Sequence, residues 1–506
     1  MFKYLSGIFI LCICMCIAGN AQRIFYSEPD RDDIKSLNFE IAGKISNHFL
    51  VYKNNRNNHN IAVFDNDMKL IEKTTLDFFP ERVISTDLIN YKDFFYLFYQ
   101  YQKKNIVYCM SAKINGDGKI VGEPKQLDTT AINFFANNKL YTIINSDDKQ
   151  KIMVLKVNSK STEENILTTT LFDRELNQLH KTRIAIPMPE RSDFLTEFTL
   201  DNEGGLAFAR PAGTSQNDNI SSISFITKEP LSDDVAYHSI DVSNIYLDDI
   251  RIKADNIHKG YLIASFYSKT KRGNLDGIYC ILWDKAQSKP INTVATVFSD
   301  EMRRDAKTDG SEKTAFNDFY LQKLLIRKDG GFVIVSESVY TSTRGINNNR
   351  WDYFGSPYSS FSDYYYLSSP YSSYYYPWGR YGGANQVNRY FADNISIMSF
   401  DSSAAIQWSN VIHKSQYDDY TDNLIGYGIM NTGTEVHFLF NQLERRTQLL
   451  TDQSITPDGQ VNRSPTLRNL DKEYQFMPRF SKHVSNNEII VPCQYRNFIC
   501  FAKIEF

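Results

Sequence analysis

The feature that most constrains this chain is a unit in which a polar turn is followed by a strongly apolar strand. Most successive copies of the unit lie about 45 to 66 residues apart, and such a period is typical of repeat architectures. The eight copies are SNHFLVY (46–52), KDFFYLFY (92–99), NNKLYTII (137–144), NEGGLAFA (202–209), HKGYLIASF (258–266), KDGGFVIV (328–335), GTEVHFLF (433–440) and NNEIIVP (486–492).

A second recurring feature is the strand that follows, which often ends in an aromatic residue and an aspartate. The clearest examples end at Asp65, Asp173, Asp284 and Asp401. An aspartate suits this position because its carboxylate can accept hydrogen bonds from backbone amides of the following turn. The pattern therefore indicates a hairpin turn after the third strand of each unit.

Each unit has room for four short strands, and four-stranded units repeated around an axis form a β-propeller. We expect an all-β fold in which residues 22–506 make one propeller domain of eight blades. Seven blades is the alternative, because the units between residues 100 and 190 are irregular. The last unit ends on its third strand, so we expect RIFYSE (23–28) to supply the fourth and close the ring.

The N-terminus reads as a secretory signal peptide over residues 1–21. Lys3 supplies the positive charge, an apolar run extends from about Leu5 to Ile17, and Gly19 and Ala21 provide small residues for cleavage. The alternatives are an uncleaved membrane anchor and lipidation at Cys14 or Cys16. We expect an exported protein of the periplasm or outer cell surface of a Gram-negative bacterium, with no transmembrane segment in the mature chain.

Charge and cysteine content narrow the function classes. The formal net charge of −3 gives no electrostatic reason to expect nucleic-acid binding. Removal of the signal leaves Cys109, Cys280, Cys493 and Cys500, too few for a disulfide scaffold. Cys493 and Cys500 lie on two strands, and a turn at Arg496-Asn497 makes them a hydrogen-bonded pair that suits a disulfide poorly. Buried free thiols are favoured, with a disulfide as the alternative.

An aromatic stretch interrupts the sixth unit. The segment from Thr341 to Phe391 contains 11 Tyr, 2 Trp and 3 Phe, and it separates the second and third strands of one blade. We expect a loop insertion at about 341–392, near the long loops 299–318 and 413–423 on the same face. It is interpreted as a packed cover, a mobile low-complexity loop or a binding surface. The candidate binding residues are Trp351, Tyr364, Tyr365, Tyr366, Tyr374, Tyr375, Tyr376 and Trp378, with Asp418 and Asp419 as polar rim.

Motifs of known chemistry are missing from the sequence. The eight histidines show no metal-ligand spacing, His437 reads as a satisfied core residue, and there is no nucleophile elbow, P-loop or dinucleotide-binding glycine motif. We therefore expect no catalytic residues, metal or cofactor, and a protein-binding or scaffolding module with an envelope protein as partner. A glycan is the second candidate ligand, and a glycosidase or lyase is the enzymatic alternative.

Several of these segments resemble a group of secreted proteins of Bacteroidota-type bacteria. The resemblance covers the signal ending NAQ, the aromatic-Asp strands, the Tyr-rich insertion, residues 393–416 and HFLFN (437–441), and it is best from about 320 to 506. Within it, Lys and Gln follow a tryptophan-containing strand, and a Phe-rich strand ends in Asn. The group has no assigned activity, so the resemblance implies a propeller-like envelope protein and no catalytic residues.

Overall fold

The computed structural model describes residues 22–506 with several gaps. The residues outside the description are 1–21, 32–37, 56, 134, 137–138, 160–162, 190–192, 213–218, 308–310, 344–345, 348–387, 420–421, 445–446 and 465–473. The expected signal peptide therefore lies outside the described residues.

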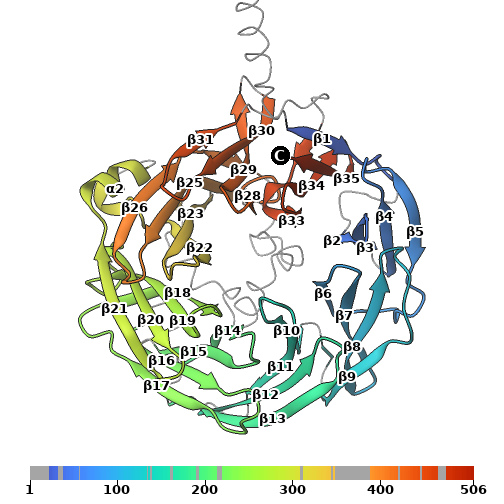
Figure 1. Ribbon diagram of the computed structural model, residues 1–506, viewed down its shortest axis with the longest axis horizontal. Coiled ribbons are helices and arrows are strands. Elements are labelled where there is room, and N and C mark those ends of the chain that lie inside the picture. Colours follow the sequence, from blue (N-terminus) through green and yellow to red (C-terminus); the bar gives the residue numbers. More distant parts are fainter. Residues whose placement is uncertain are drawn as a thin grey trace, which may run out of the picture.

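Eight antiparallel sheets stand around a central axis and form a β-propeller (Figure 1), which confirms the expected fold and the count of eight blades. Blade 1 contains β2 (Asn38–Ile45), β3 (His48–Asn55), β4 (Asn58–Phe64) and β5 (Leu70–Thr75). Blade 2 contains β6 (Ser85–Asn90), β7 (Phe94–Lys103), β8 (Ile106–Asn115) and β9 (Lys125–Ala131). Blade 3 contains β10 (Thr142–Asn145), β11 (Lys151–Ser159), β12 (Glu164–Asp173) and β13 (Gln178–Pro187). Blade 4 contains β14 (Thr196–Leu200), β15 (Leu206–Ala212), β16 (Ser222–Lys228) and β17 (Ala236–Ile240).

The second half of the ring repeats this order from the innermost strand outward. Blade 5 contains β18 (Tyr246–Asp255), β19 (Gly260–Ser268), β20 (Gly277–Asp284) and β21 (Lys289–Val297). Blade 6 contains β22 (Phe319–Ile326), β23 (Phe332–Thr343), β25 (Asn388–Phe400) and β26 (Ile406–Ile412), with the short strands β24 (Ile346–Asn347) and β27 (Gln416–Asp418) added. Blade 7 contains β28 (Tyr427–Asn431), β29 (Val436–Glu444), β30 (Thr447–Ile455) and β31 (Val461–Arg463). Blade 8 contains β32 (Tyr474–Phe476), β33 (Lys482–Ser485), β34 (Glu488–Tyr495), β35 (Phe498–Glu505) and β1 (Arg23–Tyr26).

The ring is closed by its N-terminal strand, as the sequence predicts. β1 pairs antiparallel with β35, from Arg23 opposite Glu505 to Tyr26 opposite Ala502. Ser27 extends the contact, because its amide donates to the carbonyl of Phe501 over 2.8 Å. This pairing removes the open edge that β35 would otherwise present to other chains.

One of the eight sequence copies is assigned to the wrong strand. NNKLYTII (137–144) ends in β10, which is the innermost strand of blade 3, and the second strand of that blade is β11. The true turn before β11 is held by the hydroxyl of Ser146, which accepts from the amide of Lys151 over 3.0 Å. A change from polar to apolar residues also occurs where the chain enters a blade, so the pattern alone did not separate the two positions.

The aspartates at the ends of the third strands have the predicted role. Asp65 Oδ1 accepts from the amides of Asp67 and Lys69 over 2.9 and 2.8 Å. Asp401 Oδ1 accepts from Ser403 and Ala405 over 2.8 and 3.0 Å. The aromatic residue before each aspartate, Phe64 or Phe400, is buried against a neighbouring blade. Each aromatic-aspartate pair thus provides a hydrogen-bonded turn and an aromatic side chain that is buried in the core.

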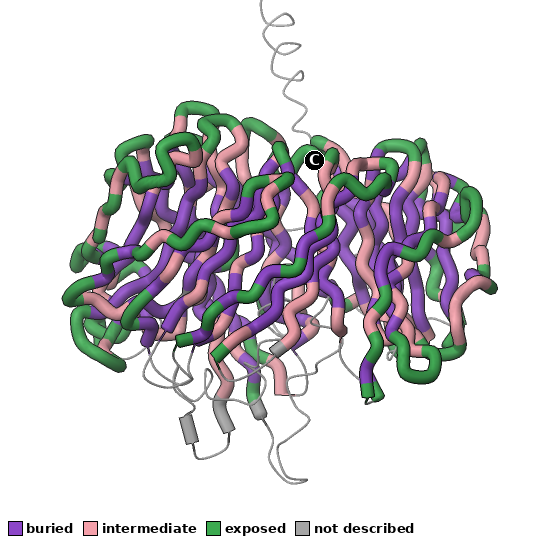
Figure 2. The backbone as a smooth tube through the Cα atoms, turned by 90° about the horizontal axis from the view of Figure 1, so that it is seen from below, coloured by how far each residue is buried: buried purple, intermediate pink, exposed green. Residues whose placement is uncertain are grey.

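The core lies between the blades. Figure 2 shows buried strand interiors framed by exposed turns on both faces of the ring. His437 is buried on β29, and its Nδ1 lies 3.1 Å from Asp452, which confirms it as a satisfied core histidine. Cys493 and Cys500 face each other across the two-residue turn at Arg496-Asn497 and are buried free thiols, as expected.

In the part of the chain that the structure describes, the helices are short: α2 (Asp300–Ala306), η1 (Glu312–Thr314) and η3 (Pro478–Phe480). Ser299 caps the N-terminus of α2, because its hydroxyl accepts from the amide of Met302 over 3.2 Å and so satisfies a free donor of the first turn. Among the described residues, no helix is long and apolar enough to cross a membrane.

We predict that closure contributes strongly to stability. Ile24 lies opposite Ile504 and packs on an apolar cluster of blades 7 and 8, so Ile24→Asp would place a carboxylate against buried side chains. We expect a loss of about 2–4 kcal/mol in the free energy of unfolding, measured by urea denaturation. Arg23→Gln, on the exposed side of the same strand, should change it by less than about 0.5 kcal/mol. Equal effects of the two substitutions would contradict a stabilising closure.

Candidate functional site at blade 6

The Tyr-rich insertion begins and ends on a two-stranded stem. β23 and β25 are the longest strands of blade 6, and they remain paired as far as Thr343 opposite Asn388. β24 pairs with the end of β23, and β27 pairs with the start of β25. The two ends of the insertion are therefore held side by side on one face of the ring, named here the insertion face.

Both long loops that flank the insertion in sequence reach this stem. The loop 413–423 supplies β27, with Tyr390 opposite Asp418 and Ala392 opposite Gln416. The loop 299–318 contains α2, and Asn394 donates from its side-chain amide to the carbonyl of Ala306 over 3.2 Å. The three segments that the sequence placed on one face thus meet at the base of the insertion.

The aromatic candidates cannot be placed by the structure. Residues 348–387 contain Trp351, Tyr364, Tyr365, Tyr366, Tyr374, Tyr375, Tyr376 and Trp378, and all eight lie outside the described residues. Asp418 and Asp419, the two acidic candidates, are described and lie at the end of β27 beside the stem.

Aromatic rings and one ion pair stiffen the outer part of the stem. Tyr340 and Phe391 stack across β23 and β25, with ring centroids 4.5 Å apart and planes 8° from parallel. Arg389 Nε lies 2.6 Å from Asp419 Oδ1, and its guanidinium lies 4.6 Å from the centre of the Tyr417 ring. Asp419 is therefore held by an arginine of the stem, and Tyr417 keeps half of its surface exposed beside it.

Beneath the stem, a buried lysine organises a polar network between blades 6 and 7. Lys414 Nζ lies 2.8 Å from Glu337 Oε1 and donates to the carbonyl of Ala392 over 2.7 Å and to Gln416 Oε1 over 3.0 Å. Glu337 and Lys414 are both buried, with at most 5% of either residue exposed. A buried charge of this kind is tolerated because it is paired and hydrogen-bonded.

The network continues into blades 7 and 8 through two amide side chains. Gln416 donates to the carbonyl of Asn441 over 2.7 Å and accepts from the amide of Gly426 over 2.8 Å. Asn441 in turn donates to the carbonyls of Leu424 and Phe476, each over 2.8 Å. Lys414, Gln416 and Asn441 are the Lys, Gln and Asn of the resemblance noted in the sequence, and in this chain they hold three blades together.

Asp393 lies near this lysine, and Asp318 lies near Asp393. Asp393 is 1% exposed and accepts a hydrogen bond from the hydroxyl of Tyr340 over 3.0 Å. Burial raises the pKa of Asp393, and burial together with the charge of Asp393 raises the pKa of Asp318 to about 6. Burial also lowers the pKa of Lys414. Because a raised carboxyl pKa penalises the ionised folded state, Asp318 makes folding less favourable as the pH rises from 3.8 to about 6, and this penalty stays constant at higher pH.

The sequence did not single out Glu337, Asp393 or Asp318. Glu337 carries a visible signal, since it is a charged residue within the apolar run VIVSESVY. Its partner Lys414 lies in a loop beyond the insertion, and only the pairing of β25 with β26 and β27 brings the two together. Lys414 and Glu337 hold each other, and the hydroxyl of Tyr340 holds one oxygen of Asp393, so the group supports the base of the stem.

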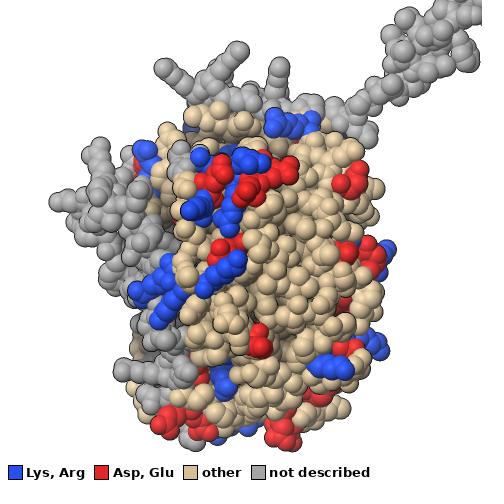
Figure 3. Space-filling view, turned by 90° about the vertical axis from the view of Figure 1, so that its left-hand side faces the viewer, with Lys and Arg blue, Asp and Glu red and all other residues tan. Residues whose placement is uncertain are grey.

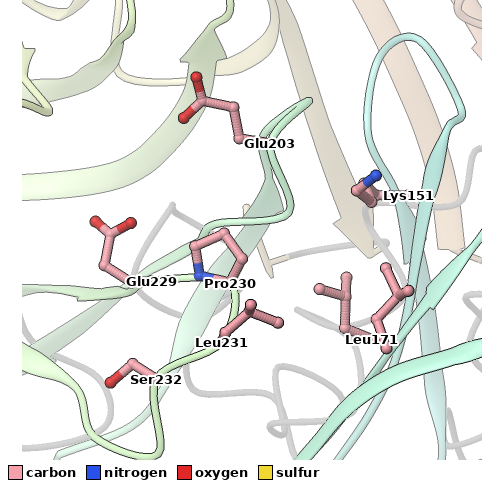
Figure 4. A pocket seen from close by; sticks show the side chains of 8 residues that line it. Lys151, Leu171, Glu203, Glu229, Pro230, Leu231 and Ser232 are labelled. Atoms are coloured by element: carbon pink, nitrogen blue, oxygen red, sulfur yellow. The ribbon is translucent and has the colours of Figure 1, made fainter.

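A pocket of about 710 Å³ lies on the opposite face, between blades 3 and 4 (Figure 4). In Figure 4 the side chains of Leu171 and Leu231 face each other, and the carboxylates of Glu203 and Glu229 point away from the space between them. Glu203 is also held by Lys285 Nζ over 2.8 Å, which keeps its pKa below the ordinary value. The pocket is thus an apolar hollow and does not present two converging acids.

The surface of blades 5 and 6 is electrostatically mixed. Figure 3 shows acidic and basic side chains beside one another on this side of the ring, with wide uncharged areas between them. Charges of both signs also occur along α2, in which Asp300 and Glu301 precede Arg303 and Arg304. Within the described residues, no group of three or more His, Cys, Asp or Glu side chains is arranged to hold a metal ion.

Comparisons with known proteins give distant structural likeness only. No protein-family model and no curated protein matches the sequence. A polysaccharide lyase described as an ulvan lyase is 10% identical, with 82% of this chain and 90% of that chain covered and a TM-score of 0.38. Prolyl oligopeptidase B from Galerina marginata is 9% identical, with 92% and 56% covered and a TM-score of 0.41. A protein of unknown function from Bacteroides caccae is 10% identical, with 74% and 93% covered and a TM-score of 0.27.

These similarities are too weak to carry an activity. The present chain spans about half the length of the prolyl oligopeptidase that it matches. The functional argument therefore depends on the geometry of this chain.

We predict that Lys414 and Glu337 act as a coupled pair. Lys414→Met would leave the Glu337 carboxylate buried without its cation, at a cost of about 3–5 kcal/mol in unfolding free energy. The double variant Lys414→Met, Glu337→Gln should recover at least about 1 kcal/mol of that loss, because no unpaired charge remains. Urea denaturation of the wild type, both single variants and the double variant gives the coupling energy. Additive effects would show that the two side chains do not support each other.

Proposed function

We propose that this protein is a non-catalytic binding or scaffolding module of the bacterial envelope, and that its aromatic insertion is the binding surface. The observation that supports the proposal is the stem. β23, β25 and β27 form a three-stranded extension of blade 6, and it carries residues 344–387 at its end. Binding residues are often carried by loops that a rigid scaffold positions.

The composition of the insertion suits a contact surface. Tyr and Trp give a large contact area at low entropic cost, because each side chain has few rotatable bonds. Within residues 348–387 the aromatic candidates are accompanied by Ser, Pro and Gly and by few charges. Such a surface favours a protein partner, and Arg389 with Asp419 at the stem would form a polar rim beside it.

Contacts in both the exposed and the buried part of the stem keep the insertion at one position on the ring. The stack of Tyr340 on Phe391 and the ion pair of Arg389 with Asp419 order the exposed part, while the Lys414 network fixes the buried part. A partner held by the insertion would therefore be held at a fixed place relative to eight blades. An exported protein of the periplasm or outer surface, with an envelope protein as partner, fits both this role and the signal-like N-terminus.

The test replaces the insertion and keeps its stem. Residues 344–387 would be exchanged for Asn-Gly, a two-residue turn that joins paired strands, so that Thr343 and Asn388 stay opposite each other. We expect the variant to unfold within a few degrees of the wild type and to lose capture of the partner from a solubilised envelope fraction. A second variant would keep the length and exchange the eight aromatic candidates for Ser.

The outcomes are distinct. Loss of capture by both folded variants supports the aromatic surface. Capture unchanged in both would overturn it, and loss of folding would identify the insertion as a structural cover. If soluble envelope glycans release the bound wild type and no protein partner is captured, the same surface would be assigned to a carbohydrate ligand.

A further inference from the structure

The hollow between blades 3 and 4 presents apolar surface to solvent (Figure 4). Leu171 of β12 is its most buried lining residue, with 2% of its surface exposed. Leu179 and Leu231 also line the hollow and are 42% and 69% exposed, so both leave apolar surface in contact with water. Apolar surface that gathers around a hollow and is rimmed by polar residues is typical of ligand-binding grooves. An apolar ligand that covered the two leucines would remove this surface from water.

Two backbone features shape this hollow. The pairing of β12 with β13 skips Leu179, which is therefore the extra residue of a β-bulge. A bulge redirects a side chain relative to the regular alternation of a strand. On the other wall, Gly204 in the turn between β14 and β15 has a φ of +97°, and a Cβ atom there would lie 3.1 Å from Leu171 Cδ2. Because glycine adopts this conformation and has no Cβ, the turn of blade 4 comes close to the leucine of blade 3.

Lys151 supplies a positive charge to the wall of the hollow. It begins β11, and its side chain stands on the same side of the hollow as Leu171 (Figure 4). Asp173 lies opposite Lys151 in the sheet, but its carboxylate accepts from the backbone and side-chain amides of Asn177 over 2.8 and 2.9 Å. Within the described part of the chain, no carboxylate forms an ion pair with Lys151. The ammonium group is therefore available to an anionic ligand.

The two acids of the lining leave this charge in place. Glu203 is held by Lys285 Nζ over 2.8 Å, and the carboxylates of Glu203 and Glu229 both point away from the hollow (Figure 4). An anion at Lys151 would therefore meet no converging carboxylate.

The size and the lining of the hollow favour an aliphatic chain as ligand. Its volume of about 710 Å³ lies within the range of small-molecule pockets, roughly 300–1,000 Å³. A cavity of about 150 Å³ already holds benzene, so one apolar side chain of a protein partner would fill only a small part of the space. None of the described residues that line the hollow is aromatic, so a sugar ring would find no aromatic face on which to stack.

We propose that this hollow binds a free fatty acid, with the aliphatic chain between blades 3 and 4 and the carboxylate at Lys151. The chain would cover Leu171, Leu179 and Leu231, and its affinity would rise with each methylene that leaves water. The Lys151 ammonium would donate a charge-assisted hydrogen bond to the carboxylate. The site lies on the face opposite the insertion, so it is independent of the binding role proposed for the insertion.

The test is calorimetric titration of the full chain with octanoate, decanoate and 1-octanol near neutral pH, where both acids are ionised. We expect saturable binding of both acids by the wild type. Decanoate should bind at least about fivefold more tightly than octanoate, because two further methylenes are buried. Octanoate should bind at least about tenfold more tightly than 1-octanol, because only octanoate carries a charge that Lys151 can pair with.

Two substitutions test the two parts of the site. Lys151→Met keeps an unbranched apolar side chain and removes the charge, so it should weaken the binding of both acids at least about tenfold and leave the affinity for 1-octanol within about twofold of the wild type. Leu231→Asp should abolish binding of all three probes, because it places a carboxylate among the leucines. Ile291→Asp in β21 of blade 5 is the matched control, because Ile291 is also 69% exposed. Its affinity for every probe should stay within about twofold of the wild type, because distant sites act independently.

The outcomes that would overturn the proposal are distinct. They are no saturable binding of either acid, equal affinity for octanoate and 1-octanol, unchanged binding of both acids by Lys151→Met, or equal effects of Leu231→Asp and Ile291→Asp. Both aspartate variants should unfold near the temperature of the wild type, because the substituted side chains are exposed, so a loss of binding would not reflect unfolding.

Discussion

The need to pair every strand edge is the constraint on which this structure depends. Each blade buries both faces against its neighbours, so no blade is stable on its own and the series must close. Closure depends on four residues, Arg23–Tyr26, which pair with the last strand of the chain. Once the ring is closed, the two ends of the sequence are structurally adjacent, and each blade becomes a fixed platform for its loops.

Blade 6 uses this platform differently from the others. Its second and third strands extend beyond the blade and carry a large insertion. The extension is supported where it leaves the blade. This support is the buried pair of Lys414 and Glu337, continued by Gln416 and Asn441 into the next two blades. Lys414, Gln416 and Asn441 therefore have a structural role at the base of the insertion. This structural role is separate from the binding role that we propose for the insertion itself.

Sequence periodicity predicted much of the fold because the period reflects local rules. A polar turn before an apolar strand and an aspartate after an aromatic residue each act within a few residues, so eight blades and the closing strand followed from them. The one wrong strand, β10 in place of β11, arose where two turns of similar composition lie close together. Contacts between blades, such as Arg251 with Glu197, depend on strand register and on backbone irregularities that local patterns do not encode.

The candidate site was predicted only in part, for the same reason. The sequence placed an aromatic insertion and two flanking loops on one face, and the stem, α2 and β27 agree with that placement. It did not reveal the acids beneath the stem. Asp318, Asp393 and Glu337 come from three different strands or turns, and each looks ordinary in its own segment.

The central claim is that the stem is a rigid part of the propeller. Hydrogen–deuterium exchange of the backbone amides tests it most directly, because exchange reports how often a paired strand opens. We predict that amides of Val339–Thr343 and Arg389–Ala392 are protected for times comparable to those of β19 in the core of blade 5. Exchange of these amides within seconds, while β19 stays protected, would contradict the claim and remove the physical basis for a positioned binding surface.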